Sequence, residues 1–217
     1  VKLSAGTFVA RFRITGLMET IAETLAEVGW VILPDFMPLE QVRELRAQAQ
    51  AQWEAGQFHA AGIGRGQELN VNEAVRSDQV QWLEQAESGV LADYQAQIES
   101  LRGNLNRMLY LGLFEFEGHF AVYPPGAFYR RHLDNFRGTS ARIITAILYL
   151  NEDWQDADGG QLRFYTDTTD GGDYVDIFPR AGQLVLFRSA KFWHEVLPAR
   201  RERFSLTGWL RTRGDGI

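Results

Sequence analysis

Two histidines and one aspartate stand at a spacing that could bind a metal ion. His132 and Asp134 are separated by a single residue, and His194 lies further along the chain. In proteins, two imidazoles and one carboxylate can hold one face of an iron(II) octahedron and leave the other face open for substrate and dioxygen. In a strand, residues 132 and 134 would point to the same face, so both could reach one ion. The sequence therefore predicts a non-haem iron centre at these three residues.

An arginine follows the predicted metal ligands. Arg203 lies a few positions beyond His194, and it can sit on the next strand with its side chain in the same cavity. A guanidinium forms paired hydrogen bonds with a carboxylate, so Arg203 could bind the far carboxylate of a dicarboxylic co-substrate. Together with the predicted iron centre, this arginine indicates an oxygenase.

Each of these residues also has a simpler explanation. His132 could make a hydrogen bond on a surface strand, with Asp134 beginning a turn. His194 follows two aromatic residues, where a histidine can be a satisfied core residue. Arg203 closes a charged run, 200–203, that solvent could cover. We favour the metal site because all of these features occur together and Arg203 begins an aromatic strand pattern.

The composition limits the class of protein. The chain has 217 residues, a formal net charge of −6 at pH 7 and a pI near 5.3, so it has no general attraction to nucleic acid or anionic membranes. It contains no cysteine, which excludes disulfides and cysteine-based zinc sites. No apolar run approaches the roughly 18 residues of a membrane span, and the first residues lack a secretory signal pattern. We expect a cytoplasmic monomer with no nucleic-acid or membrane partner.

The first half of the sequence is predicted to be helical. Apolar residues recur at helical spacing in three stretches, and a glycine follows each of the first two. Between these two, the run 30–33 has the pattern of a short buried strand. We assign the apolar stripes to core packing rather than to a cofactor site. The stripes are Leu17, Ile21, Leu25 and Val28; Leu39, Val42, Leu45 and Ala49; and Val90, Tyr94, Ile98, Leu101, Leu105 and Met108.

A glycine-rich segment, 56–79, separates the second and third predicted helices. Its alternating glycines, Gly62, Gly64 and Gly66, are reminiscent of a phosphate-binding loop, but the spacing, the lysine and the following helix of that motif are absent. Long loops inside compact domains are often lids or binding loops. We therefore predict that this segment closes over a substrate.

From about residue 115 the pattern changes to short strands divided by turn residues. Such a series fits an antiparallel sandwich or a double-sheet jelly roll. We predict an α+β fold, mainly β, with a jelly-roll core at 115–211 and N-terminal helices, within 1–114, packed on the larger sheet. The whole chain, 1–217, is expected to be one domain. Strands are expected at 116–123, 143–150, 162–165, 174–178, 184–187, around His194 and at 204–210.

Two stretches of the chain resemble a known enzyme family. Residues 129–154 include YRRHLDN and YLNEDW, and residues 159–209 include GGQLR, HEV and RFSLTGW. Both stretches resemble the iron- and 2-oxoglutarate-dependent prolyl hydroxylases, in particular the hypoxia-inducible-factor hydroxylases of animals and their bacterial relatives. The resemblance covers about 30–211 and is most specific from 120 onward. It implies a double-stranded β-helix, in agreement with the strand pattern.

The resemblance implies a role for each matching residue. The iron(II) ligands would be His132, Asp134 and His194, with 2-oxoglutarate as co-substrate, O2 as oxidant and ascorbate (vitamin C) as an accessory factor. Around the 2-oxoglutarate, the matching residues are Arg203, Tyr149, Tyr123 and Thr207. Around the substrate, they are Arg76, Asp78, Arg142 and Trp209. Two further histidines, His59 and His119, have no partner at ligand spacing and are assigned structural roles.

The implied activity is 4-hydroxylation of a prolyl residue in a protein. For a bacterial relative, the resemblance suggests an exposed prolyl loop of an abundant protein as partner, with elongation factor Tu as one candidate. Two alternatives stay open: the same chemistry on a free amino acid or other small molecule, and a metal-binding sensor or cupin-like module without turnover. The joint presence of Tyr149 and Arg203 favours an oxygenase because together they fit a dicarboxylate.

Overall fold

Three helices occur where the apolar spacing predicts them. A computed structural model describes residues 16–62, 71–135, 141–167 and 172–213. The helices are α1 (Leu17–Glu27), α2 (Leu39–Glu54) and α3 (Val90–Leu109). Gly29 and Gly56 follow α1 and α2 with φ of 95° and 69°, a backbone conformation that glycine adopts without strain. In the described ranges, no helix combines the length and apolar character of a membrane span.

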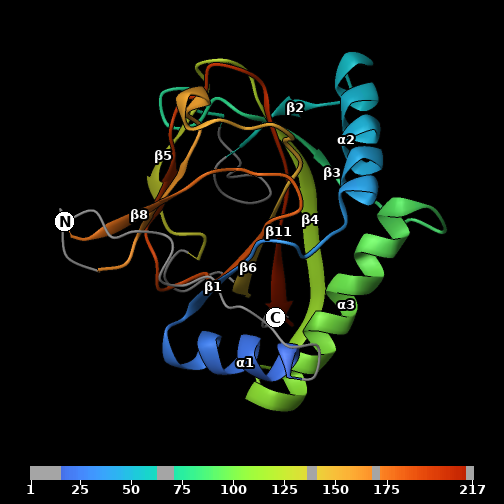
Figure 1. The fold of residues 1–217 in the computed structure, drawn as a ribbon, viewed down its shortest axis with the longest axis vertical. Coiled ribbons are helices and arrows are strands. Elements are labelled where there is room, and N and C mark those ends of the chain that lie inside the picture. Colours follow the sequence, from blue (N-terminus) through green and yellow to red (C-terminus); the bar gives the residue numbers. More distant parts are fainter. Residues whose placement is uncertain (1–15, 63–70, 136–140, 168–171, 214–217) are drawn as a thin grey trace.

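The strands form two antiparallel sheets that face each other (Figure 1). The larger sheet has the order β1-β9-β6-β11-β4-β3-β2, and the smaller has the order β5-β10-β7-β8. In the larger sheet the strands are β1 (Trp30–Leu33), β2 (His59–Ala60), β3 (Gln79–Trp82), β4 (Leu113–Tyr123), β6 (Arg142–Tyr149), β9 (Leu184–Arg188) and β11 (Arg203–Thr212). In the smaller sheet they are β5 (Tyr129–His132), β7 (Leu162–Tyr165), β8 (Tyr174–Ile177) and β10 (His194–Val196).

The order of the strands is that of a double-stranded β-helix. From β4 to β7, successive strands alternate between the larger and the smaller sheet, and from β8 to β11 they alternate again. The chain therefore crosses from one sheet to the other at nearly every turn, as in a jelly roll. The predicted fold class is confirmed.

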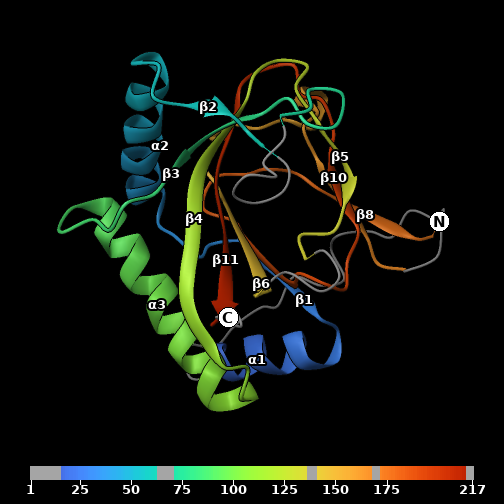
Figure 2. The same ribbon diagram turned by 180° about the vertical axis from the view of Figure 1, so that it is seen from behind.

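Each strand of the larger sheet has one face toward the helices and one toward the smaller sheet. In β11, Phe204 and Leu206 belong to the apolar core shared with α1, α2 and α3. Their neighbours Arg203 and Ser205 point the other way, because side chains alternate along a strand. Figures 1 and 2 show the three helices on one side of the larger sheet and β5 and β8 on the other. The space between the sheets is therefore where polar residues of these strands can meet.

Two local features differ from the sequence prediction. The glycine-rich segment contains β2 and leads into β3, which extend the larger sheet beyond β4. Neither strand was among those expected: β2 has only two residues, and β3 has a single buried residue, Val80. Gly64 and Gly66 lie outside the described residues. The placement of His132 and Asp134 on one continuous strand is wrong, because β5 ends at His132 and Asp134 lies in the bend that follows.

Candidate active site

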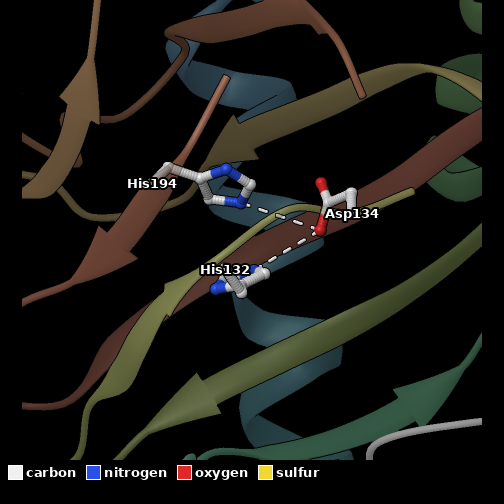
Figure 3. A group of neighbouring side chains, drawn as sticks. All are labelled: His132, Asp134 and His194. Atoms are coloured by element: carbon white, nitrogen blue, oxygen red, sulfur yellow. Dashed lines mark ion pairs between the residues drawn. The ribbon is translucent and has the colours of Figure 1, made fainter. Parts of the chain in front are cut away.

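The three predicted metal ligands converge between the two sheets (Figure 3). His194, the first residue of β10, pairs with His132, the last residue of β5. One carboxylate oxygen of Asp134, Oδ1, lies 3.4 Å from Nε2 of His132 and 3.6 Å from Nε2 of His194. One ligand atom from each residue lies within 4.8 Å of the other two. This donor set, two imidazole nitrogens and a carboxylate oxygen, fits iron(II).

Backbone contacts aim both imidazoles at the same point. Nδ1 of His132 lies 2.7 Å from the carbonyl oxygen of Arg130, and Nδ1 of His194 lies 3.1 Å from that of Phe192. A carbonyl only accepts, so Nδ1 carries the hydrogen in both rings and the lone pair of Nε2 is free for a metal. Burial, together with the neighbouring His194, lowers the pKa of His132. The ring is therefore held in its neutral, metal-binding form.

The carboxylate of Asp134 is held ionised. Burial opposes its ionisation, but the two histidines that face it, His194 and His132, outweigh that effect and hold the pKa of the carboxyl well below its usual range. An ionised carboxylate is the form of this side chain that binds a metal.

A buried cation lies on β11, beside two buried tyrosines. The side chain of Arg203 is 2% exposed, and its Nε donates to the carbonyl oxygen of Gly160 at 2.9 Å. Its Cζ lies 4.9 Å and 5.1 Å from the ring centroids of Tyr123 and Tyr149. Among the described residues, no carboxylate forms an ion pair with Arg203, and the buried hydroxyl of Tyr149 has no hydrogen-bond partner. A cation and a free hydroxyl side by side are complementary to a carboxylate group.

The neighbouring tyrosines remain protonated at neutral pH. Burial raises the pKa of Tyr149 to about 12, although the charge of Arg203 opposes the shift. Burial also raises the pKa of Tyr123 well above its ordinary value. Both hydroxyls can therefore donate a hydrogen bond. Thr207 lies on the same face of β11, with its hydroxyl 3.2 Å from that of Ser205.

The residues expected near the substrate form two groups. Arg142 lies over the ring of Trp209, with Cζ 3.4 Å from the centroid, and its Nη2 is 3.2 Å from Oε1 of Glu117. Arg76 and Asp78 form a paired ion contact, at 2.8 Å and 2.6 Å, and Asp78 is 2% exposed. The carboxylate of Asp78 is thus engaged by Arg76, so this pair fixes the shape of its segment.

Tyr129 and Thr145, near the site, were given no role in the sequence analysis, and His119 was assigned a structural one. Tyr129 stacks on His132 with ring centroids 3.5 Å apart, and Cζ of Arg76 lies 4.2 Å from the centroid of Tyr129 on its other side. Thr145 donates a 2.7 Å hydrogen bond to Oδ2 of Asp134. His119 is buried beside Trp209 with its Nδ1 unbonded among the described residues.

Only Thr145 left a signal in the sequence that could have been read. It is a polar residue within the apolar run of β6, and it lies four positions before Tyr149. A period of two puts both residues on the same face of the strand.

Comparisons with known proteins decide the family. A family model described as the 2OG-Fe(II) oxygenase superfamily matches residues 118–211. A crystal structure of a Pseudomonas putida prolyl-4-hydroxylase is 44% identical, with a TM-score of 0.82, over 91% of this chain and 100% of that one. The chain belongs to the prolyl hydroxylases of the 2OG-Fe(II) oxygenase superfamily. This membership confirms the expected family, with iron(II) and 2-oxoglutarate as its cofactor and co-substrate.

More distant prolyl hydroxylases are similar over most of this chain. The hypoxia-inducible factor prolyl hydroxylase of Caenorhabditis elegans is 27% identical over 94% of this chain. A prolyl hydroxylase from Trichoplax adhaerens, solved with a peptide fragment of the hypoxia-inducible factor oxygen degradation domain, is 27% identical with a TM-score of 0.79, over 90% of this chain and 89% of that one. The chain spans less than half the length of the first curated relatives that it matches.

Proposed function

We propose that this chain hydroxylates a prolyl residue of a protein at C-4, using iron(II), 2-oxoglutarate and O2 and releasing succinate and carbon dioxide. The observation that carries the proposal is the buried Arg203 beside the unbonded hydroxyl of Tyr149, in a fold that also brings His132, Asp134 and His194 together. A metal-binding cluster alone would suit many proteins. A buried receptor for a carboxylate in the same fold is what a dicarboxylate co-substrate would require.

The chain supplies the binding groups for iron and 2-oxoglutarate. His132, Asp134 and His194 would hold iron(II), which together with 2-oxoglutarate and O2 supplies the oxidation of a substrate C–H bond. Arg203 binds the far carboxylate of 2-oxoglutarate through charge-assisted hydrogen bonds, and the hydroxyl of Tyr149 donates to the same group. Tyr123 and Thr207 line the same pocket. Because the receptor is fixed on β11 and β6, a longer or shorter dicarboxylate is rejected.

The substrate side presents an aromatic and cationic surface. Trp209 lies on the same face of β11 as Arg203, with Arg142 over its ring, and a prolyl ring can pack on such a surface. Arg76 and Asp78 hold their segment against β5, where the backbone N–H of Ser77 donates to the carbonyl oxygen of Phe128 at 3.0 Å. We infer that this pair acts by shaping the loop over a peptide. The expected closure of the glycine-rich segment, 56–79, stays a prediction, since residues 63–70 lie outside the described residues.

The finer assignments are proposals of the same kind. We propose a monomeric, cytoplasmic enzyme that uses ascorbate as an accessory factor and acts on an exposed prolyl loop, with elongation factor Tu as one candidate. Likeness to a prolyl hydroxylase solved with a peptide supports a protein substrate. Free amino acids remain the alternative substrate class, because the receptor for 2-oxoglutarate would serve either.

The test compares the two substrate classes directly. The purified chain with Fe(II), 2-oxoglutarate and O2 is incubated with prolyl peptides, including the prolyl loops of elongation factor Tu, or with free proline. We expect the mass of one oxygen atom to be added to a peptide, succinate to form in step with it, and both to disappear in His132→Ala. Turnover of free proline alone would favour the small-molecule alternative. Undiminished turnover in His132→Ala would contradict the iron site.

A further inference from the structure

The two oxygens of Asp134 have different surroundings. Oδ1 faces Nε2 of both histidines, at 3.4 Å and 3.6 Å, and is the oxygen that can bind a metal together with them. Oδ2 points away from the histidines in Figure 3, and it accepts a 2.7 Å hydrogen bond from the hydroxyl of Thr145. The carboxylate is therefore fixed at both ends, with one oxygen toward the metal position and one toward β6.

A second hydroxyl stands behind the first. Oγ of Ser189 lies 2.9 Å from Oγ1 of Thr145. A metal-binding carboxylate is ionised and can only accept, so the single hydroxyl proton of Thr145 is used on Asp134. Ser189 must then be the donor to Thr145. The hydrogen bonds run in one direction, from Ser189 to Thr145 to Asp134, and such chains strengthen each bond by polarisation.

The two hydroxyls are mounted on the most firmly held part of the fold. Thr145 lies in β6 and is paired on both sides, with Trp209 of β11 and Phe187 of β9. Ser189 follows β9 directly, and its backbone N–H donates to the carbonyl oxygen of Ile143 at 3.0 Å. Both side chains are fully buried. Asp134, by contrast, lies in a bend after β5 ends.

We propose that Thr145 and Ser189 are positioning residues that hold Asp134 as a one-oxygen metal ligand. The inference rests on the proposed function, in which the remaining coordination sites of the metal are needed for 2-oxoglutarate and O2. Without the hydroxyl of Thr145, the carboxylate can turn about its terminal torsion angle, which is a soft one. Oδ2 could then also reach the metal and occupy one of those sites.

A simpler explanation must be separated from this one. A buried threonine hydroxyl needs an acceptor whatever the site does, so its contact with Asp134 could serve packing alone. In that case removal of the hydroxyl would change the stability of the metal-free protein and leave metal affinity as it was. A positioning role predicts instead that removal of the hydroxyl weakens metal binding.

The experiment measures Mn(II) binding to the metal-free chain in four variants. Thr145→Val removes the hydroxyl at constant shape, and Thr145→Ser keeps it. Ser189→Ala removes the second hydroxyl, alone and together with Thr145→Val. The matched control is Thr24→Val on α1, where the lost hydroxyl donates only to the carbonyl oxygen of Thr20. Urea unfolding of each metal-free variant is measured alongside.

We expect Thr145→Val to weaken Mn(II) binding about tenfold or more, as loss of a group that orients a metal ligand does. Thr145→Ser and Thr24→Val should stay within about twofold of the parent, since the first retains the donor and the second is remote. Ser189→Ala should weaken binding about threefold, and the double variant should equal Thr145→Val, because Ser189 acts only through Thr145.

Three results would overturn the proposal. The first is an Mn(II) affinity of Thr145→Val within twofold of the parent. The second is a double variant that binds Mn(II) more weakly than Thr145→Val by the full factor seen in Ser189→Ala. The third is a loss of Mn(II) affinity in Thr24→Val as large as in Thr145→Val. If Thr145→Val fails to fold, Ser189→Ala alone decides, and parental affinity in that variant overturns it. Since Mn(II) binding is read without turnover, a chain that passes this test but hydroxylates no prolyl residue would overturn only the proposed function.

Discussion

Arg203 is a cation buried without a carboxylate partner among the described residues. Loss of one member of a buried, hydrogen-bonded charge pair costs about 2–5 kcal/mol. We therefore expect Arg203→Met to weaken the binding of 2-oxoglutarate to the Mn(II)-loaded chain by about a hundredfold. Tyr149→Phe removes one neutral donor worth about 1 kcal/mol, so we expect about a fivefold loss. Isothermal titration measures both affinities.

The control for this change lies two residues earlier. The side chain of Arg201 is 45% exposed, so Arg201→Met removes the same positive charge from the chain without touching the pocket. Its affinity for 2-oxoglutarate should remain within about twofold of the parent. Equal losses in the two variants would show that overall charge, and not the buried receptor, governs binding.

His119 links the site to the pH dependence of stability. Burial, together with the charges of Arg76 and Arg142, lowers its pKa from 6.5 to about 3. The unfolded chain therefore takes up this proton more readily than the folded chain, and stability falls as the pH drops from about 6.5 toward 3. One proton contributes a slope of up to about 1.4 kcal/mol per pH unit. Above pH 6.5 the histidine is neutral in both states and has no such effect.

Urea unfolding at pH 7.5, 6.5 and 5.5 tests this prediction in the parent chain and in His119→Gln. The variant should lose less stability between pH 6.5 and 5.5 than the parent, by about 1 kcal/mol. His132 and Asp134 titrate in both proteins, so the difference between the two curves isolates His119. Parallel curves would mean that His119 is not buried as a neutral ring.

At the scale of elements, β4, β6 and β11 build the core and the site from alternating positions. Leu148 and Phe204 pack on the helices, while their neighbours Tyr149 and Arg203 lie on the opposite face of the sheet and contact each other. A shift of pairing by one residue would reverse both faces, so the register that forms the core also aims the functional groups. The pairing of Gly118 with Gly208 in β4 and β11 is one feature that holds this register.

The ring of Phe116 covers these two paired glycines. A methyl group on Gly118 would meet only side chains, with the ring of Phe116 at 2.7 Å, whereas a methyl group on Gly208 would also meet the backbone oxygen of Glu117 at 2.6 Å. Overpacking of this kind costs about 1–3 kcal/mol. We expect both Gly118→Ala and Gly208→Ala to destabilise the chain in urea unfolding, and Gly208→Ala to cost more.

The same two substitutions made in Phe116→Ala separate the contact with the ring from the contact with the backbone. In Phe116→Ala the ring is absent, so Gly118→Ala should cause little further loss of stability. Gly208→Ala should still be destabilising, because a backbone oxygen cannot move aside as a ring can. If Phe116→Ala relieved both substitutions equally, the contact with Glu117 would not be the cause.

At the scale of the whole molecule, the sequence predicted what depends on local period and on residue type. The helices and the strands β1, β4 and β6 to β11 were expected from their patterns, whereas β5 was not. His132, Asp134, His194 and Arg203 have the right types and order. β2 and β3 were not expected from the sequence; β3 pairs with the edge of β4, and β2 pairs with β3 in turn.

The contacts behind the metal ligands could not be read from the chain. Thr145 and Ser189 lie 44 positions apart, and their contact follows from the pairing of β6 with β9. The stack of Tyr129 on His132 likewise depends on side-chain orientation at the end of β5. The predicted metal ligands could be found from the sequence because their residue types and spacing are distinctive. The hydroxyl groups and rings that orient them belong to residue types that occur throughout the chain.

The site joins the two sheets, so its ligands should stabilise the whole fold. His132 and His194 come from the smaller sheet, whereas Arg203 and Tyr149 come from the larger one. A ligand that binds only the folded state adds about 2.7 kcal/mol at a concentration of one hundred times its Kd. For a chain of this size that corresponds to about 5–10 °C in Tm. We expect Mn(II) to raise Tm, 2-oxoglutarate to raise it further, and a chelator to reverse both effects.

Two variants separate the contributions of the sheets to this effect. Arg203→Met should keep the rise with Mn(II) and lose most of the further rise with 2-oxoglutarate, because only the larger-sheet anchor is gone. His132→Ala should lose both rises, since 2-oxoglutarate needs the metal as well as the arginine to bind tightly. A full rise in Tm with 2-oxoglutarate in His132→Ala would mean that Arg203 alone binds the co-substrate. The metal would then not contribute to the stabilisation of the two sheets by 2-oxoglutarate.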